Sequence, residues 1–304
     1  PSTIVSTEVG SNVLKRTAVA TRGAYNQLRY SIDLSYLETD GIDVLKDDSQ
    51  QNRDTDGYKN FSINTNFGYT FDNGVDVGLS FLEAHSRIYL DGSSYPDRDS
   101  FSDSIIQNIG FSISAPLRDW WLSKISMGRS MDDIDDTNGI DGSHISDFRT
   151  TKDQYSWQND IEIFNEQIIT FGVDLYDDEL VASTDYTDTQ GVPVRDRMNR
   201  AYFIQYQGNF SIFDYVLGYR EDDNEENGKQ NTSNISLGAQ LGKSHRVIFS
   251  WGEAFKAPTY NDLYWPIGEY GAGNPDLLPE DSENFELGFR GDYTVWKWEA
   301  SIYQ

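Results

Sequence analysis

Residues 28–36 read Leu-Arg-Tyr-Ser-Ile-Asp-Leu-Ser-Tyr, and apolar and polar side chains alternate at every position. Successive side chains of a β-strand point to opposite faces, so a period of two separates the apolar set from the polar set. The stretch therefore predicts a strand with one apolar face and one polar face.

The same alternation recurs along the chain, for example at Ile109, Phe111 and Ile113, and no segment shows a convincing helical period. We expect about fifteen strands, at residues 3–9, 13–21, 26–38, 59–71, 75–86, 105–115, 120–131, 153–164, 168–178, 198–208, 212–221, 232–241, 246–254, 284–291 and 295–304. Strands of soluble proteins average about five or six residues, whereas a tilted strand that crosses a bilayer needs about nine to eleven. Because many of these segments reach that length, the sequence predicts an all-β fold, a transmembrane antiparallel β-barrel.

The connections between these strands alternate in length. Short turns are expected at 72–74, 116–119, 165–166, 208–209 and 242–244, and long polar loops at 39–58, 87–104, 132–152, 179–197, 222–231 and 255–283. Antiparallel strands then place the short turns at one end of the sheet and the long loops at the other. Outer-membrane barrels have this layout, with short periplasmic turns and long extracellular loops.

A soluble β-sandwich would also alternate, but its outward positions would be mainly charged. Here the polar positions are mostly Asn, Ser, Gly, Thr and Gln, which suits a wide, hydrated lumen. Aromatic residues such as Tyr36, Phe71 and Tyr206 gather near strand ends, as in the interfacial girdles of membrane barrels. The composition of the two faces therefore favours the membrane barrel.

Charge and composition exclude several classes of protein. The chain has 304 residues, a formal net charge of −26 and no cysteine, and its mean hydropathy is −0.61. Nucleic-acid binding needs clustered Lys and Arg, so it is not expected. Disulfides, thiolate nucleophiles and zinc–sulfur sites require cysteine. Both ends read as cuts, because no signal peptide opens the chain and a strand is still in progress at Gln304.

Catalytic signatures are not found. His85, His144 and His245 lie far apart in the sequence and lack the spacing of metal ligands. No nucleophile elbow, phosphate-binding loop or dinucleotide fingerprint occurs. We therefore do not expect an enzyme.

One ordered motif lies between residues 246 and 291. A strand ending in Phe255-Lys256-Ala257-Pro258 is followed by a Gly-rich stretch, and then by Gly273-Asn274-Pro275, Leu277, Pro279 and Glu280. This order resembles the barrel of TonB-dependent outer-membrane receptors. The resemblance implies a place in the bacterial outer membrane, transport driven through the TonB energy-coupling protein, and contact with membrane lipid and lipopolysaccharide.

That family has about 22 strands around a plugged lumen. The resemblance thus implies that residues 1–304 form a partial barrel, with an N-terminal plug domain upstream and roughly seven strands downstream. Because a bilayer does not tolerate an unpaired sheet edge, this part alone is not expected to insert stably.

The motif itself has two readings. Its prolines fix φ and end strand pairing, which would let the loop fold back over the barrel mouth; the alternative is direct contact with a ligand. The aromatic residues Tyr264, Trp265 and Tyr270 are better ligand candidates, with packing inside the loop as the alternative.

Within the family, the cobalamin (vitamin B12) receptors are most similar. Residues 41–44 (Gly-Ile-Asp-Val), 54–57 (Asp-Thr-Asp-Gly), 89–91 (Tyr-Leu-Asp) and 96–98 (Pro-Asp-Arg) resemble their calcium-binding loops. Leu90 and Asp99 depart from that pattern. Carried over residue by residue, the calcium ligands would be Asp43, Asp54, Asp56, Asp91 and Asp97. Calcium takes six to eight hard oxygen ligands, often from loops; the alternative is a solvated acidic loop.

These observations favour active uptake of a scarce organometallic nutrient, with cobalamin in first place. A ferric-siderophore or haem receptor of the same family comes second, because its anionic ligands usually require basic loops. A passive porin or barrel adhesin comes third, since neither would need the motif at 255–280.

Overall fold

A computed structural model describes residues 1–43, 55–90, 100–138, 142–182, 196–265 and 271–304. Fifteen strands and one short helix occur in these ranges: β1 (Ser2–Val9), β2 (Lys15–Tyr25), β3 (Leu28–Thr39), β4 (Tyr58–Thr70), β5 (Asp76–Leu90), β6 (Ser100–Arg118), β7 (Trp121–Thr137), β8 (His144–Phe164), β9 (Gln167–Ala182), β10 (Asp196–Phe210), β11 (Phe213–Asn224), β12 (Gly228–Leu241), β13 (His245–Lys256), α1 (Tyr260–Tyr264), β14 (Glu280–Asp292) and β15 (Lys297–Tyr303). The predicted all-β class and the number of strands are confirmed.

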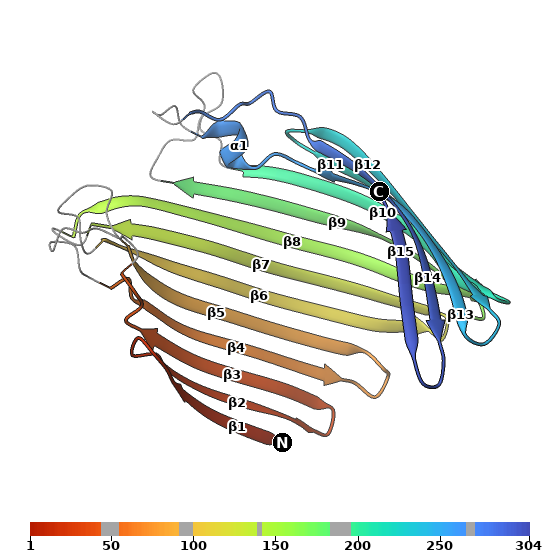
Figure 1. Ribbon diagram of the computed structural model, residues 1–304, viewed down its shortest axis with the longest axis horizontal. Helices are drawn as coiled ribbons and strands as arrows, with labels where there is room; N and C mark the ends of the chain where they lie inside the picture. The colour runs from red at the N-terminus through yellow and green to blue at the C-terminus, as the bar shows by residue number, and fades with distance from the viewer. Residues whose placement is uncertain (44–54, 91–99, 139–141, 183–195, 266–270) are drawn as a thin grey trace.

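The strands form a single sheet in sequence order, and each is antiparallel to its neighbours. Figure 1 shows them side by side in a curved sheet whose two ends differ. We call the end that carries α1 the loop rim and the end with the tight turns, such as 165–166 and 211–212, the turn rim. Each chain reversal therefore occurs at the end that the alternation of connections predicts.

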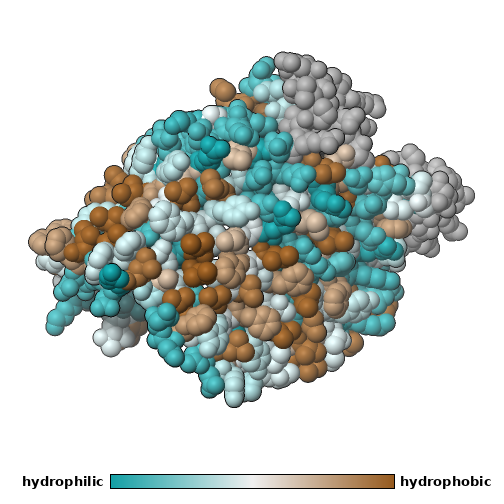
Figure 2. Space-filling view, turned by 180° about the vertical axis from the view of Figure 1, so that it is seen from behind, coloured by the Kyte–Doolittle hydropathy of each residue, from teal (hydrophilic) through white to brown (hydrophobic). Residues whose placement is uncertain are grey.

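The register sorts side chains onto two faces. One cross-strand row reads Phe67, Leu79, Phe111, Met127, Tyr155 and Leu175. The row beside it reads Asn66, Ser80, Gly110, Gly128, Gln154 and Tyr176. We call the first face the outer face and the second the lumenal face. Figure 2 shows hydrophobic side chains gathered across the middle of one side of the sheet, as a lipid-facing belt requires.

Two predicted loops are wrong, because the strands run further toward the loop rim. Residues 132–152 were expected as a loop, yet β7 and β8 continue until only 138–143 separate them. Across these extensions, Arg149 pairs with Asp133 at 2.6 Å. Alternation of apolar and polar residues stops where a strand leaves the hydrocarbon, so charged strand residues there read as loop. The loop expected at 222–231 likewise shrinks to 225–227.

Boundaries also move at the turn rim. The second strand, expected at 13–21, runs from Lys15 to Tyr25, and Asn26 turns the chain with a φ of 51°. β6 includes Pro116, where an irregular register between Pro116 and Arg118 accommodates the missing N–H. The turn expected at 208–209 lies at 211–212.

Few side chains are buried, which fits a sheet one strand thick. The buried hydrophobic residues among those described are Leu180, Ala201, Tyr260 and Leu263. Two of these belong to α1 and two to the neighbouring strands, so the packed region lies where the loop rim meets α1. No helix in the described ranges is long and apolar enough to cross a membrane.

Candidate functional site

The segment after β13 leaves the sheet at the motif prolines and forms α1. Thr259 is the N-cap: its Oγ1 accepts a hydrogen bond of 3.2 Å from the Asp262 N–H. In return, Asp262 Oδ2 accepts bonds from the Thr259 N–H (2.9 Å) and Oγ1–H (2.7 Å). This capping box satisfies donors at the start of the helix. The bonds from Thr259 hold the pKa of Asp262 below its usual value, because they favour the charged carboxylate.

α1 lies against the lumenal face of the sheet, near the strand ends at the loop rim. The Tyr260 side chain packs against Leu180, and its hydroxyl donates a hydrogen bond of 3.1 Å to the Asp178 carbonyl oxygen. Burial raises the pKa of Tyr260 above its ordinary value. Leu263 is 3% exposed. α1 is thus docked by an apolar contact and a backbone hydrogen bond.

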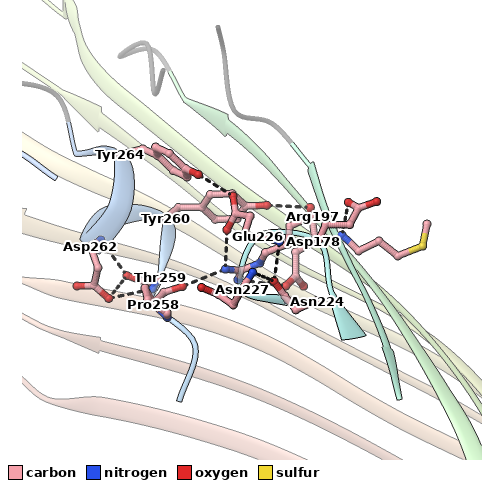
Figure 3. Close-up of polar contacts among 12 residues, drawn as sticks. Asp178, Arg197, Asn224, Glu226, Asn227, Pro258, Thr259, Tyr260, Asp262 and Tyr264 are labelled. Atoms are coloured by element: carbon pink, nitrogen blue, oxygen red, sulfur yellow. Dashed lines mark hydrogen bonds and ion pairs between the residues drawn. The ribbon is translucent and has the colours of Figure 1, made fainter. Parts of the chain in front are cut away.

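Arg197, at the start of β10, holds the same segment from the other side. Its Nη1 donates to the Pro258 carbonyl oxygen at 3.0 Å and to Glu226 Oε2 at 3.3 Å, and its Nη2 lies 3.6 Å from Asp178 Oδ2. The guanidinium lies 4.9 Å from the centre of the Tyr260 ring. Figure 3 shows Arg197 between these partners. One side chain therefore contacts β9, the β11–β12 turn and the segment after β13.

The β11–β12 turn is itself well ordered. Asn224 Oδ1 accepts hydrogen bonds from the backbone N–H groups of Glu226 (3.0 Å) and Asn227 (3.2 Å), which fixes the turn in the way that asparagine commonly does. Glu226 then has both carboxylate oxygens engaged, since Tyr264 donates to its Oε1 at 3.1 Å. Through Glu226, the β11–β12 turn is therefore a second support for α1.

The Gly-Asn-Pro part of the motif closes the segment against α1. The Gly273 N–H donates to the Trp265 carbonyl oxygen at 2.8 Å, and the Asn274 N–H donates to the Asp262 carbonyl oxygen at 2.8 Å. A Cβ on Gly273 would collide with the backbone nitrogens of Tyr264 and Trp265, so only glycine fits this approach. Asn274 Oδ1 accepts a bond of 3.1 Å from the Asp276 N–H. The segment folds back toward the lumen, and the motif residues have a structural part in that fold.

The predicted ligand-binding aromatics have different surroundings. Tyr264 is half-buried against the sheet, whereas Trp265 is 52% exposed at the end of α1. Tyr270 lies outside the described residues. Ligand contact by these three residues stays a prediction, for which Trp265 has the accessible surface.

Of the predicted calcium ligands, the structure describes Asp43, which follows β3, and Asp56, which precedes β4. The Asp56 N–H donates to the Ile42 carbonyl oxygen at 3.0 Å, so the segments that carry Asp43 and Asp56 lie side by side. The Tyr89 N–H donates to the Gly57 carbonyl oxygen at 3.0 Å, which ties the end of β5 to the same place. We call this region the aspartate corner.

Asp54, Asp91 and Asp97 lie outside the described residues. Among the residues that are described, no three or more His, Asp or Glu side chains group closely enough to hold a metal ion. Calcium binding by the five aspartates therefore stays a prediction.

Arg197, Asp178 and Glu226 were missed by sequence reasoning. All three fall in or beside segments that were expected to be solvated loops. The register places Arg197 opposite Asp178, a relation that appears only once the strand extensions are known.

The family described as "TonB dependent receptor-like, beta-barrel" matches residues 38–304. The chain belongs to this family. TonB-dependent receptors are outer-membrane receptors and transporters, and the chain is accordingly an outer-membrane protein. The order of its motif and the layout of its strands predicted this membership correctly.

Curated relatives of this receptor chain include two vitamin B12 transporters. One, BtuB from Photobacterium profundum, is 28% identical over 271 residues, which are 87% of this chain and 41% of the relative. BtuB from Vibrio cholerae is 26% identical over 305 residues, covering 99% of this chain and 48% of the relative. The chain thus spans about half the length of the curated relatives it matches.

Solved structures of TonB-dependent receptors share the fold. The siderophore receptor PirA from Acinetobacter baumannii matches 99% of this chain and 51% of its own, with a TM-score of 0.78 and 16% identity. The FrpB iron transporter from Neisseria meningitidis matches 99% of this chain and 54% of its own, with a TM-score of 0.77 and 12% identity. At these identities the likeness shows the fold alone.

Proposed function

We propose that this chain is the ligand-capturing part of an outer-membrane transporter that imports cobalamin with energy delivered through TonB. The observation that carries the proposal is the loop rim, where α1 and the aspartate corner lie on one end of a sheet of the receptor family. A capture site on the extracellular side needs loops that are already ordered, because ordering on binding costs affinity. The docking of α1 by Arg197 and Tyr260 supports such pre-ordering.

Cobalamin is placed first because curated relatives that match 87% and 99% of the chain are named vitamin B12 transporters. The net charge of −26 also favours this ligand over anionic ferric siderophores, which usually bind to basic mouths. The neighbours named as siderophore receptors or iron transporters are matched at 16% identity or less among those compared above, so they do not displace cobalamin.

Calcium belongs to the same proposal. Asp43 and Asp56 would be two of its ligands, and Asp54, Asp91 and Asp97 the others. A cation with six to eight oxygen ligands would neutralise these carboxylates and order the connections that carry them. The backbone bond between Ile42 and Asp56 supports this idea, because it brings together the segments that carry Asp43 and Asp56.

The test is a titration of cyanocobalamin into the full-length, detergent-purified receptor, first with calcium and then with a chelator. Tight binding that weakens on chelation is the expected result. In Asp43→Asn/Asp56→Asn the affinity with calcium should fall to the chelated value. Asp119→Asn is the matched control, because Asp119 is an exposed carboxylate in a turn at the opposite rim.

Other results would change the proposal in defined ways. Binding that ignores calcium would keep cobalamin and remove the five aspartates as ligands. No cobalamin binding in either buffer would reject the substrate and place a ferric siderophore or haem first. A full-length protein that conducts ions through an open pore without a plug would instead indicate a passive porin.

A part of the receptor that ended at residue 304 is expected not to insert into membranes by itself, because β1 and β15 would present unpaired edges to lipid.

A further inference from the structure

Arg197 contacts three parts of the loop rim at once: the end of β9, the β11–β12 turn and the segment between β13 and α1. The strand it opens, β10, follows the connection from β9, and its partners lie in the β11–β12 turn and in the segment between β13 and α1. The Arg197 side chain is 14% exposed, and its partners Asp178 and Glu226 are 24% and 17% exposed. These charges are thus partly removed from solvent. Salt therefore screens them less than it screens charges at an open surface.

The contacts use features that only arginine provides. A guanidinium is planar and offers several N–H donors in a fixed fork, so one group can serve a carbonyl oxygen and carboxylates together. Arg197 Nη1 is shared between Pro258 O and Glu226 Oε2. The guanidinium carbon also lies over the Tyr260 ring, at a distance typical of cation–π contacts. Lysine could keep one ion pair but not the whole arrangement.

The partners of Arg197 differ in what they lose without it. Asp178 also lies 3.3 Å from Lys152 Nζ, and Glu226 retains the hydrogen bond from Tyr264. The Pro258 carbonyl oxygen, by contrast, accepts from Arg197 the hydrogen bond that ties the segment before α1 to β10. Loss of Arg197 should therefore free α1 at its start more than it disturbs β9 or the β11–β12 turn.

We propose that Arg197 is the positioning residue that fixes α1 in the mouth of the receptor, so that α1 is a stationary wall of the ligand chamber and not a moving lid. The role of α1 as a chamber wall rests on the proposed function, whereas its placement by Arg197 does not. Arg197 acts through α1 and need not touch the ligand.

The placement can be measured without any ligand. The chain has no cysteine, so two introduced cysteines can carry nitroxide labels, Asp223→Cys on the outer face of β11 and Asn261→Cys on α1. Both positions are exposed. Pulsed electron paramagnetic resonance on the full-length receptor should give a narrow distance distribution. Arg197→Ala should broaden it at least two-fold, and Arg197→Lys should lie between the two.

Arg129→Ala is the matched control. Arg129 is exposed on the outer face of β7, which does not pair with β11, and it pairs with the carboxylate of Asp153, so the variant removes the same charge and an ion pair away from the labels. Heat-modifiable gel mobility establishes that each variant still forms a folded barrel. An unchanged distribution in Arg197→Ala, or equal broadening in Arg129→Ala, would overturn the proposal.

A second measurement concerns the ligand. If cobalamin binds, Arg197→Ala should raise its dissociation rate about ten-fold, since a loosened wall no longer pre-orders the chamber. A broadened distribution in a receptor that binds no cobalamin would keep Arg197 as the positioning residue and reject only the proposed substrate. A broadened distribution with unchanged cobalamin dissociation would reject α1 as a chamber wall.

Discussion

Trp251 Nε1 donates a hydrogen bond of 2.7 Å to Glu283 Oε1 across β13 and β14. Trp251 follows Val247 and Phe249 on the outer face, while Glu253 is the next outer residue toward the loop rim. The indole thus lies where the apolar belt gives way to charged side chains. A ring with an apolar body and a polar tip suits this boundary.

The first prediction concerns this bond. Trp251→Phe keeps an aromatic ring and removes the donor, so the free energy of unfolding should fall by about 1 kcal/mol. Unfolding of the full-length receptor in lipid vesicles, followed by tryptophan fluorescence and corrected for the missing indole, would measure it. Trp120→Phe, at an exposed tryptophan of the turn rim, should change stability less. Equal losses of stability in the two variants would mean that replacing the indole ring, and not losing the hydrogen bond, lowers the free energy of unfolding.

The same boundary explains how far the sequence could predict the fold. Within the belt, alternation such as that of 28–36 reveals most of the strands, because lipid selects one face and the wet lumen the other. Between the belt and the loop rim both faces are polar, as at Asp133 and Arg149. The alternation of apolar and polar residues disappears there, although the hydrogen-bonded ladder continues. Strand count and order could therefore be predicted, whereas strand ends at the loop rim could not.

A second prediction tests the aspartate corner. Gly41 has a φ of +71°, and a Cβ there would collide with the Asp56 carbonyl oxygen. Gly41→Ala should therefore separate the segments of Asp43 and Asp56 and lower the calcium affinity at least ten-fold. Gly228→Ala is the control, because Gly228 has a φ of +68° but open space around its Cβ position, so it carries the backbone strain alone. Calcium affinity from isothermal titration calorimetry that is equal in both variants would contradict the role of the corner.

The candidate site could be predicted only in part, for a reason visible at Gly273 and Arg197. The motif that contains Gly273 has a fixed order along the chain, so its residues could be listed from the sequence. Arg197 is 61 positions away from Pro258, and the contact forms only because the segment after β13 folds back to the start of β10. A contact made by a single side chain to a backbone atom leaves no pattern in one sequence.

A third prediction follows from the close approach of Gly273 to α1. Gly273→Ala should push the Gly-Asn-Pro turn away from Tyr264 and Trp265, break the bond from the Asn274 N–H to the Asp262 carbonyl oxygen, and broaden the label distance between positions 223 and 261. Gly252→Ala in β13 is the control, since its Cβ would meet its nearest neighbour at an ordinary 3.7 Å. A distribution as narrow as that of the parent would show that the turn does not support α1.

The last prediction is a pH dependence of α1. Bonds from Thr259 lower the pKa of Asp262 below its ordinary value of 3.8, and a carboxyl with a depressed pKa stabilises the folded state above its unfolded pKa. The support is thus complete at neutral pH and is lost only as the pH falls from about 4 through the lower, folded value. The label distance between positions 223 and 261 should stay narrow down to about pH 4 and broaden below it. Asp262→Asn keeps an oxygen acceptor for Thr259 but cannot titrate, so its distribution should change less over the same range. Broadening centred above pH 5 would assign the transition to another group, and identical titrations of parent and Asp262→Asn would show that the capping carboxylate does not control the order of α1.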